Sequence, residues 1–236
     1  MKRAWVFFSL ALLGVACGVA PSQPPREEPR RPPLRLCVMQ DLSGSIRRTR
    51  TVVLTPEDLR ALAEVVKART GELGFGIIGE RSDQPLERLP LLEPPPEPPG
   101  RPPTNPLLQE AWRRRKRHYD EALEAYDRRV QQRVEAFVQA AGERLQRPKA
   151  PVTDVCGAIR RCDLMLAEPF PGPVENVMVL ITDGLHNVRS SPCPEALASK
   201  ARVLLVNGEG TLGVVQRYNP IRFESPGAVL RFLRAL

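Results

Sequence analysis

Two short apolar runs in this chain each end at an aspartate, and this pattern limits the fold more than any other. Residues 34–40 read as a strand with prolines upstream, and residues 177–181 read as a second one. Short apolar runs are typical of strands buried on both faces of a parallel sheet. Further strands are expected at 73–79, 86–92, 203–207 and 221–223, and helices at 55–68, 155–166 and near the C-terminus. This alternation predicts an α/β fold with a doubly wound, mainly parallel central sheet flanked by helices.

Oxygen-bearing side chains follow these strands. Asp41, Ser43 and Ser45 alternate after the first strand, Asp183 follows the second, and Thr153 precedes the helix 155–166. Open α/β sheets bind ligands beyond the carboxyl ends of their strands, so these five side chains are expected to meet there. Carboxylate and hydroxyl oxygens suit hard divalent cations such as Mg²⁺. Taken alone, Asp-x-Ser-x-Ser is a weak signal, because the same residues also form turns.

Together, Asp41-x-Ser43-x-Ser45, Thr153 and Thr182-Asp183-Gly184 resemble the metal-ion-dependent adhesion site of the von Willebrand factor A (vWA) domain family. The order of expected strands and helices over residues 34–236 is similar to that of the family, although only the three motifs are specific to it. The resemblance implies a vWA-like, Rossmann-like fold and a divalent cation, with Mg²⁺ first and Mn²⁺ or Ca²⁺ as alternatives. In that family the serines and the threonine contact the cation directly or nearly so, and the aspartates hold its coordinated waters.

The resemblance also implies a function. An open position on the cation would accept a carboxylate from a protein partner, giving protein–protein interaction or complex assembly. One alternative is a hydrolase using Ser43, His186 and a nearby Asp, but Ser43 lacks the Gly-x-Ser-x-Gly setting of a nucleophile elbow, so no enzyme activity is expected. The other alternative is a structural or assembly lipoprotein that binds through a long basic helix.

The start of the chain has the layout of an export signal. Residues 1–16 combine a basic start with an apolar run too short for a membrane span, and they are expected to form a signal peptide. The following Cys17 resembles the lipidated cysteine of bacterial lipoproteins, although Gly14 departs from the usual Leu. Residues 17–33 would then be a proline-rich tether, and the protein would be anchored by lipid at the bacterial cell membrane or envelope. The alternative is cleavage near Ala20 and secretion.

Four cysteines remain if Cys17 is lipidated, and an exported protein with an even number allows three full disulfide pairings. In the proposed fold Cys156 and Cys193 both lie at the metal edge of the sheet, so they are the preferred pair. Cys37 lies within a strand, where a free buried thiol fits equally well.

Residues 93–148 are an insertion relative to a minimal domain of this family. Its first part, 94–106, is rich in proline, and 105–145 reads as one helix of about 40 residues, roughly 60 Å long. Five consecutive cations should surround this helix and keep its first half exposed, in a chain of formal charge +8: Arg113, Arg114, Arg115, Lys116 and Arg117. They are candidates for contact with an anionic lipid or cell-wall surface. No nucleic-acid partner is expected, because the chain is predicted to be exported.

Overall fold

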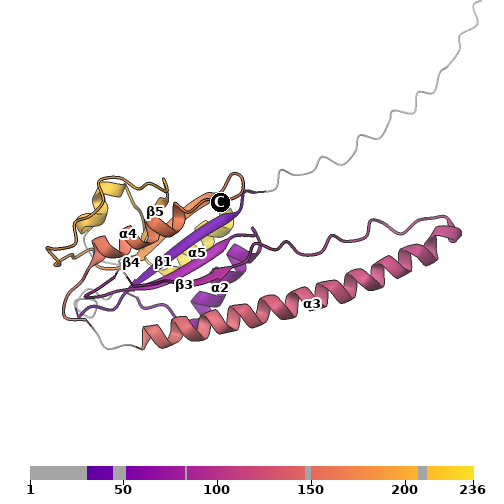
Figure 1. Ribbon diagram of the computed structural model, residues 1–236, viewed down its shortest axis with the longest axis horizontal. Helices are drawn as coiled ribbons and strands as arrows, with labels where there is room; N and C mark the ends of the chain where they lie inside the picture. The colour runs from indigo at the N-terminus through magenta and orange to yellow at the C-terminus, as the bar shows by residue number, and fades with distance from the viewer. Residues whose placement is uncertain (1–30, 45–51, 83, 147–149, 207–211) are drawn as a thin grey trace, which may run out of the picture. The chain divides into compact units, whose positions relative to one another are not determined.

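A six-stranded sheet with the order β3-β2-β1-β4-β5-β6 organises the computed structural model (Figure 1). Residues 31–44, 52–82, 84–146, 150–206 and 212–236 are described. Neighbouring strands are parallel except β2 and β3, which are antiparallel. The predicted fold class is therefore confirmed. The strands are β1 (Leu34–Asp41), β2 (Glu72–Ile78), β3 (Glu87–Pro90), β4 (Glu175–Ile181), β5 (Arg202–Val206) and β6 (Ile221–Phe223).

Helices cover both faces of the sheet and create two separate cores. The helices α2 (Pro56–Lys67), α3 (Pro106–Leu145) and α5 (Pro226–Ala235) pack on one face. The helix α4 (Val155–Leu166) and the 3₁₀ helix η1 (Gly213–Tyr218) pack on the other. Because side chains alternate along a strand, Leu36 and Val38 enter the first core and Cys37 and Met39 the second. This two-sided burial explains why β1 is apolar throughout most of its length.

Side-chain caps fix where the helices begin. Thr55 and Asp58 form a capping box at the start of α2, with Pro56 in the first turn. Asp154 accepts a hydrogen bond from the backbone of Gly157 and caps α4, and Ser225 caps α5 in the same manner through Ala228. The cap at Asp154 matters most, because it also fixes the direction in which the chain enters α4 from Thr153.

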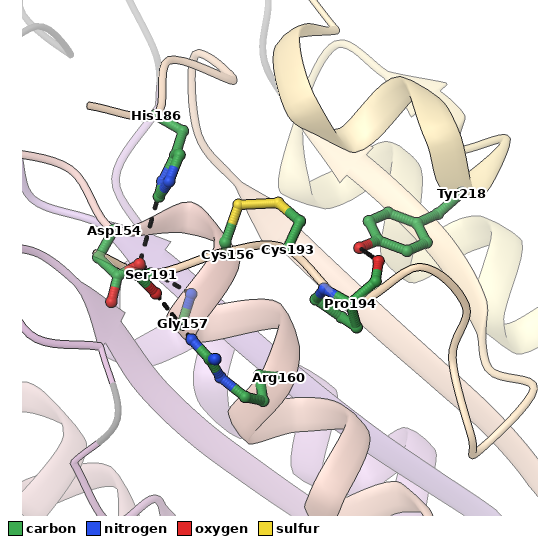
Figure 2. Close-up of a disulfide and its surroundings, with 9 residues drawn as sticks. All are labelled: Asp154, Cys156, Gly157, Arg160, His186, Ser191, Cys193, Pro194 and Tyr218. Carbon is green, nitrogen blue, oxygen red and sulfur yellow. Dashed lines mark hydrogen bonds and ion pairs between the residues drawn. A yellow bond between two sulfur atoms is a disulfide. The ribbon is translucent and has the colours of Figure 1, made fainter. Parts of the chain in front are cut away.

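Two disulfides attach α4 to its surroundings. Cys37 in β1 is bonded to Cys162, and Cys156 is bonded to Cys193 in the loop that follows β4. The second pair is the one preferred from the sequence, and Figure 2 shows it beside Asp154 at the start of α4. The same loop is held by a hydrogen bond of 2.7 Å from Arg160 to Ser191. The helix α4 is thus fixed covalently at two points, at Cys156 in its first turn to the loop and at Cys162 further along to the sheet.

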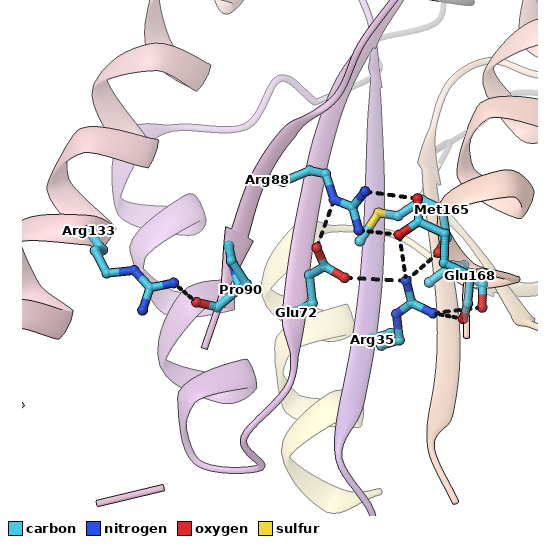
Figure 3. Close-up of polar contacts among 8 residues, drawn as sticks. Arg35, Glu72, Arg88, Pro90, Arg133, Met165 and Glu168 are labelled. Carbon is cyan, nitrogen blue, oxygen red and sulfur yellow. Dashed lines mark hydrogen bonds and ion pairs between the residues drawn. The ribbon is translucent and has the colours of Figure 1, made fainter. Parts of the chain in front are cut away.

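A fully buried arginine lies in the central strand. Arg35 is 1% exposed, and its guanidinium donates to the backbone carbonyls of Leu166, Met165 and Glu168. Figure 3 shows its ion pair with Glu72, which also pairs with Arg88 on β3. Arg88 in turn makes two hydrogen bonds of 2.8 and 2.6 Å to Glu168. The charges join the amino ends of β1 and β2 to the end of α4, so burial is compensated by pairing.

The helix α3 spans 40 residues, and the proline-rich segment 94–103, which precedes it, runs alongside its first half in the opposite direction (Figure 1). Trp112 donates to the carbonyl of Gly100 at 2.8 Å, and Tyr126 donates to that of Glu93 at 3.3 Å. Pro96 and Pro99 are half-buried, and their spacing of three residues matches one turn of a polyproline helix; Pro103 is half-buried as well. We call segment 94–103 together with residues 106–125 of α3 the arm.

One of the five cations in the arm is less exposed than we predicted. We predicted that the cations 113–117 would leave no buried face, yet Lys116 is half-buried together with Trp112 and Tyr119. The ammonium of Lys116 lies 6.0 Å from the centre of the Tyr119 ring and pairs with Asp120 at 2.7 Å. The methylene stem of a lysine can cover apolar surface while its charge stays in water, which explains the difference. The four arginines of the cluster are exposed as expected.

Several sequence predictions lie outside the described residues: the signal peptide 1–16, the lipidation site Cys17, most of the tether 17–33, and Ser45. In the described part of the chain no helix is both long enough and apolar enough to cross a membrane.

Candidate metal site

The predicted metal ligands lie where the sheet changes its winding direction. Strand order runs outward from β1 to β2 and β3 on one side and from β4 to β5 and β6 on the other, so β1 and β4 form the switch point. Asp41 is the last residue of β1, and Thr182 and Asp183 directly follow β4. The pair Gln40 and Ile181 is in register, which puts Asp41 beside Thr182. Crevices at such switch points are the usual ligand sites of open α/β sheets.

Asp41 is completely buried and rigidly held. Its Oδ1 accepts a hydrogen bond of 2.7 Å from the backbone N–H of Ser43, and its Oδ2 accepts one of 2.7 Å from Thr182 Oγ1. Burial raises the pKa of the Asp41 carboxyl, the hydrogen bonds from Thr182 and Ser43 lower it, and the charge of Asp183 raises it further. Asp41 thus lies within electrostatic range of a second carboxyl group, and a divalent cation would stabilise such a pair.

Asp183 carries the observation that most favours a cation. Asp183 is 1% exposed, and its Oδ1 accepts a hydrogen bond of 3.0 Å from the backbone N–H of Leu185. Its Oδ2 is buried and has no hydrogen-bond partner among the described residues. A buried carboxylate oxygen without a partner carries a desolvation cost of several kcal/mol. The oxygen is therefore available for a cation or for a water bound to one.

Thr153 and Ser43 are held at the same edge by backbone contacts. The N–H of Thr153 donates to Asn187 Oδ1 at 2.7 Å, and the Thr153 carbonyl accepts from the Asn187 N–H at 3.1 Å. Ser43 forms an isolated parallel bridge with Ala150. Both segments also bind the end of β2, where Leu42 donates to the Ile78 carbonyl and the N–H of residue 154 donates to the Gly79 carbonyl.

Four of the five predicted ligands, Asp41, Ser43, Thr153 and Asp183, are thus collected at one sheet edge. Among the described residues no group of three or more His, Cys, Asp or Glu side chains is arranged to hold a metal. The predicted site would have only two carboxylates, with hydroxyls for the remaining protein ligands, so the residues fit a site of the adhesion type. Occupancy by Mg²⁺ stays a prediction.

Two residues that support the site were not on the predicted ligand list. Thr182 donates a hydrogen bond that fixes the Asp41 carboxyl. In the sequence, the signal for Thr182 is that it follows an apolar strand that ends in register with the strand before Asp41. Asn187 holds Thr153 from a loop 34 residues away in sequence. No local pattern marks Asn187, because its role depends on how the loop after β4 folds back.

His186 lies on the same loop, and its imidazole is mostly buried. Its Nδ1 is 3.9 Å from Asp154 Oδ1 and has no hydrogen-bond partner in the described part of the chain. Figure 2 shows the ring directed toward Asp154, the residue that caps α4. His186 thus lies against the residue that caps α4.

Comparisons with known proteins identify no family. No family model and no curated protein matches the chain. Among solved structures, the chain is similar to the pilus adhesin SpaC from Lactobacillus rhamnosus GG in its open conformation, at 11% identity and a TM-score of 0.43. The match covers 87% of this chain and 29% of the adhesin chain.

Proposed function

We propose that this protein is an exported, membrane-anchored vWA-like module that binds a protein partner through a divalent cation, most simply Mg²⁺. The observation that carries the proposal is the buried, unpartnered Oδ2 of Asp183 at the same sheet edge as Asp41. The motif order in the sequence supports the same assignment. The cation would supply an electrophilic point to which a carboxylate of the partner binds.

The chain's own residues would have distinct tasks at this site. Asp41 and Asp183 supply negative charge, and Asp41 is held in one orientation by Thr182. Ser43 and Thr153 supply hydroxyl oxygens, with Ser45 expected beside them. Gly184 has a φ of 79°, which favours glycine and lets the chain turn away directly after Asp183. The disulfide Cys156–Cys193 limits the movement of the loop that holds Thr153.

The proposal is tested by capture from membrane extracts in Mg²⁺. We expect a set of proteins retained by the wild type to be released by a chelator and to be absent with Asp183→Ala. The matched control is Asp127→Ala, which removes an exposed carboxylate from α3. Retention of the same proteins by Asp183→Ala in the presence of chelator would contradict a cation-dependent interaction.

A second candidate function concerns the tip of the arm. Leu107 is 88% exposed and Leu108 is 54% exposed, and both lie less than three turns from the cations 113–117. Arg113, Arg115 and Arg117 form no ion pair with any described residue. Exposed leucines beside unpaired arginines are suited to an anionic lipid surface, where apolar insertion and charge attraction add. We propose that the arm contacts such a surface.

Vesicle co-sedimentation tests this role. We expect binding to vesicles of phosphatidylglycerol and phosphatidylcholine, weaker binding at high salt, and none to phosphatidylcholine alone. Changing Arg113, Arg115 and Arg117 to Gln should reduce binding at least about tenfold, since each surface cation contributes about 1 kcal/mol. The control changes Arg217, Arg231 and Arg234 to Gln, with the same loss of charge elsewhere. Equal loss in both triple variants would show that net charge alone is responsible.

A further inference from the structure

A cavity of about 260 Å³ lies at the ends of β1 and β2, next to the candidate metal site. Its apolar wall is formed by Met39, Leu42 and Ile78, all of which are buried. Gly79 and Ala150 complete this side and contribute little or no side chain. For comparison, an engineered apolar cavity of about 150 Å³ accommodates a benzene molecule. The space is therefore sufficient for one large apolar side chain.

Three wall residues connect the cavity directly to the predicted metal ligands. Leu42 lies between Asp41 and Ser43 in sequence. The Gly79 carbonyl accepts a hydrogen bond of 2.8 Å from the N–H of the residue after Thr153. Ala150 forms the bridge with Ser43, and its carbonyl accepts a hydrogen bond of 3.2 Å from Gly44. The cavity and the metal site thus share their backbone framework.

Most polar groups around the cavity are already engaged within the protein. Arg144 donates to the Pro85 carbonyl at 2.7 Å and pairs with Glu87 at 2.5 Å. Ser82 Oγ accepts a hydrogen bond from the N–H of Gly79 at 3.2 Å. Arg81 and Gln84 have partners as well. Glu80 also lines the cavity, but it is exposed. The buried wall of Met39, Leu42 and Ile78 therefore favours an apolar group over a charged one.

We infer that this cavity binds an apolar side chain of the same partner whose carboxylate would bind the cation, an inference that rests on the proposed function. In an extended peptide, side chains at positions i and i+2 point to the same face, about 7 Å apart. The partner segment would therefore carry Asp or Glu with a large apolar residue two positions away. The cation would bind the carboxylate of the Asp or Glu, and the cavity would select the apolar residue two positions away.

The test uses two fluorescent heptapeptides in Mg²⁺, with a calorimetric Mg²⁺ titration of the same protein. One has the sequence Gly-Phe-Gly-Asp-Gly-Phe-Gly, and the other has Gly in place of both Phe residues. We expect the wild type to bind the Phe peptide at least about tenfold more tightly, the scale of burying one large apolar side chain. Ala150→Leu, whose larger side chain takes up cavity volume, should remove this preference in protein that still binds Mg²⁺ in the calorimetric titration. Ala136→Leu, on an exposed position of α3, is the matched control.

The outcomes separate the two claims. Equal affinity for both peptides in a wild type that binds Mg²⁺ would overturn the cavity assignment and leave the metal site intact. A full preference retained by Ala150→Leu would also overturn it. Absence of Mg²⁺ binding by the wild type would overturn the proposed function and this inference together. Should Ala150→Leu not fold, the comparison of the two peptides on the wild type decides alone.

Discussion

Single residues determine how charge is tolerated inside this protein. Asp183 keeps one buried carboxylate oxygen without a partner at the sheet edge. In Arg35 of β1, both terminal nitrogens of the guanidinium donate to carbonyls or to the Glu72 carboxylate, and the Nε has no partner among the described residues. A buried charge compensated by an opposite charge, as Arg35 is by Glu72, is a structural element, and removing one partner leaves the other uncompensated. A buried carboxylate oxygen that stays unpaired is a candidate for an external ligand. The contrast separates structural from functional charge in the same sheet.

Glu168, the partner of Arg88, should make the stability of the fold depend on pH. The hydrogen bonds from Arg88 lower the pKa of Glu168 below its ordinary value of 4.5, with help from the charge of Arg35. A lowered pKa in the folded state means that the carboxylate stabilises the fold above about pH 5, and that this contribution is lost as the pH falls below 4.5. Glu168→Gln should therefore lower the urea midpoint at pH 7 and flatten its decrease between pH 6 and pH 3.

The control for this measurement is Glu97→Gln in the proline-rich segment, an exposed glutamate with no ion pair to any described residue. It should leave the pH profile of the urea midpoint unchanged. An unaltered slope in Glu168→Gln would show that the charge of Glu168 does not stabilise the fold.

Individual elements follow the sequence where local signals agree, and depart from it where packing decides. The helix 155–166 was predicted with its observed bounds, because the Asp154 cap and the apolar spacing mark the same start. The segment 86–92 forms only the short strand Glu87–Pro90, antiparallel at the sheet edge. Proline composition predicted an extended segment at 94–106, but nothing local indicates that it packs on Trp112. That contact forms because the chain reverses direction between the proline-rich segment and α3.

The two disulfides should have different effects on the element that they share. In the chain-entropy account, opening the longer loop of Cys37–Cys162 costs about 5 kcal/mol and opening that of Cys156–Cys193 about 4 kcal/mol. We expect replacement of either pair by Ala to lower stability in denaturant unfolding. Only the Cys156/Cys193 variant should also weaken Mg²⁺ binding, because that bridge holds the loop that carries Asn187. Equal Mg²⁺ affinity in both variants would contradict a role for this loop.

The arm allows a test of what stabilises a 40-residue helix. Tyr126 and Phe137 are buried against the first core, so replacing both by Ala should lower the free energy of unfolding by several kcal/mol. Trp112→Ala, which removes the contact with Gly100, should have a smaller effect on global unfolding. It should instead accelerate amide hydrogen exchange in residues 106–125, because isolated helices are marginal in water. Uniform fast exchange across 106–145 in the wild type would contradict a packed arm.

At the scale of the whole molecule, the sheet brings together residues that are distant in sequence. Asp41 and Thr182 are separated by 141 positions and lie within 2.7 Å, because two parallel strands end in register at the switch point. From the strand ends we predicted that Asp41 and Asp183 would meet at this edge, but the hydrogen bond from Thr182 to Asp41 was not predicted. The sequence did not indicate the cavity lined by Leu42 and Ala150, because it depends on how three separate loops pack around the same edge.

The most direct test of the central claim is a calorimetric titration of Mg²⁺ and Mn²⁺ into the wild type and Asp183→Ala. We predict saturable binding of one cation per wild-type chain, and a rise in melting temperature that corresponds to about 2.7 kcal/mol at a hundredfold excess over Kd. Asp183→Ala should remain folded and lose both effects, since the only buried carboxylate oxygen without a hydrogen-bond partner among the described residues is gone. A wild type with no binding heat and an unchanged melting temperature in millimolar Mg²⁺ and Mn²⁺ would contradict the account.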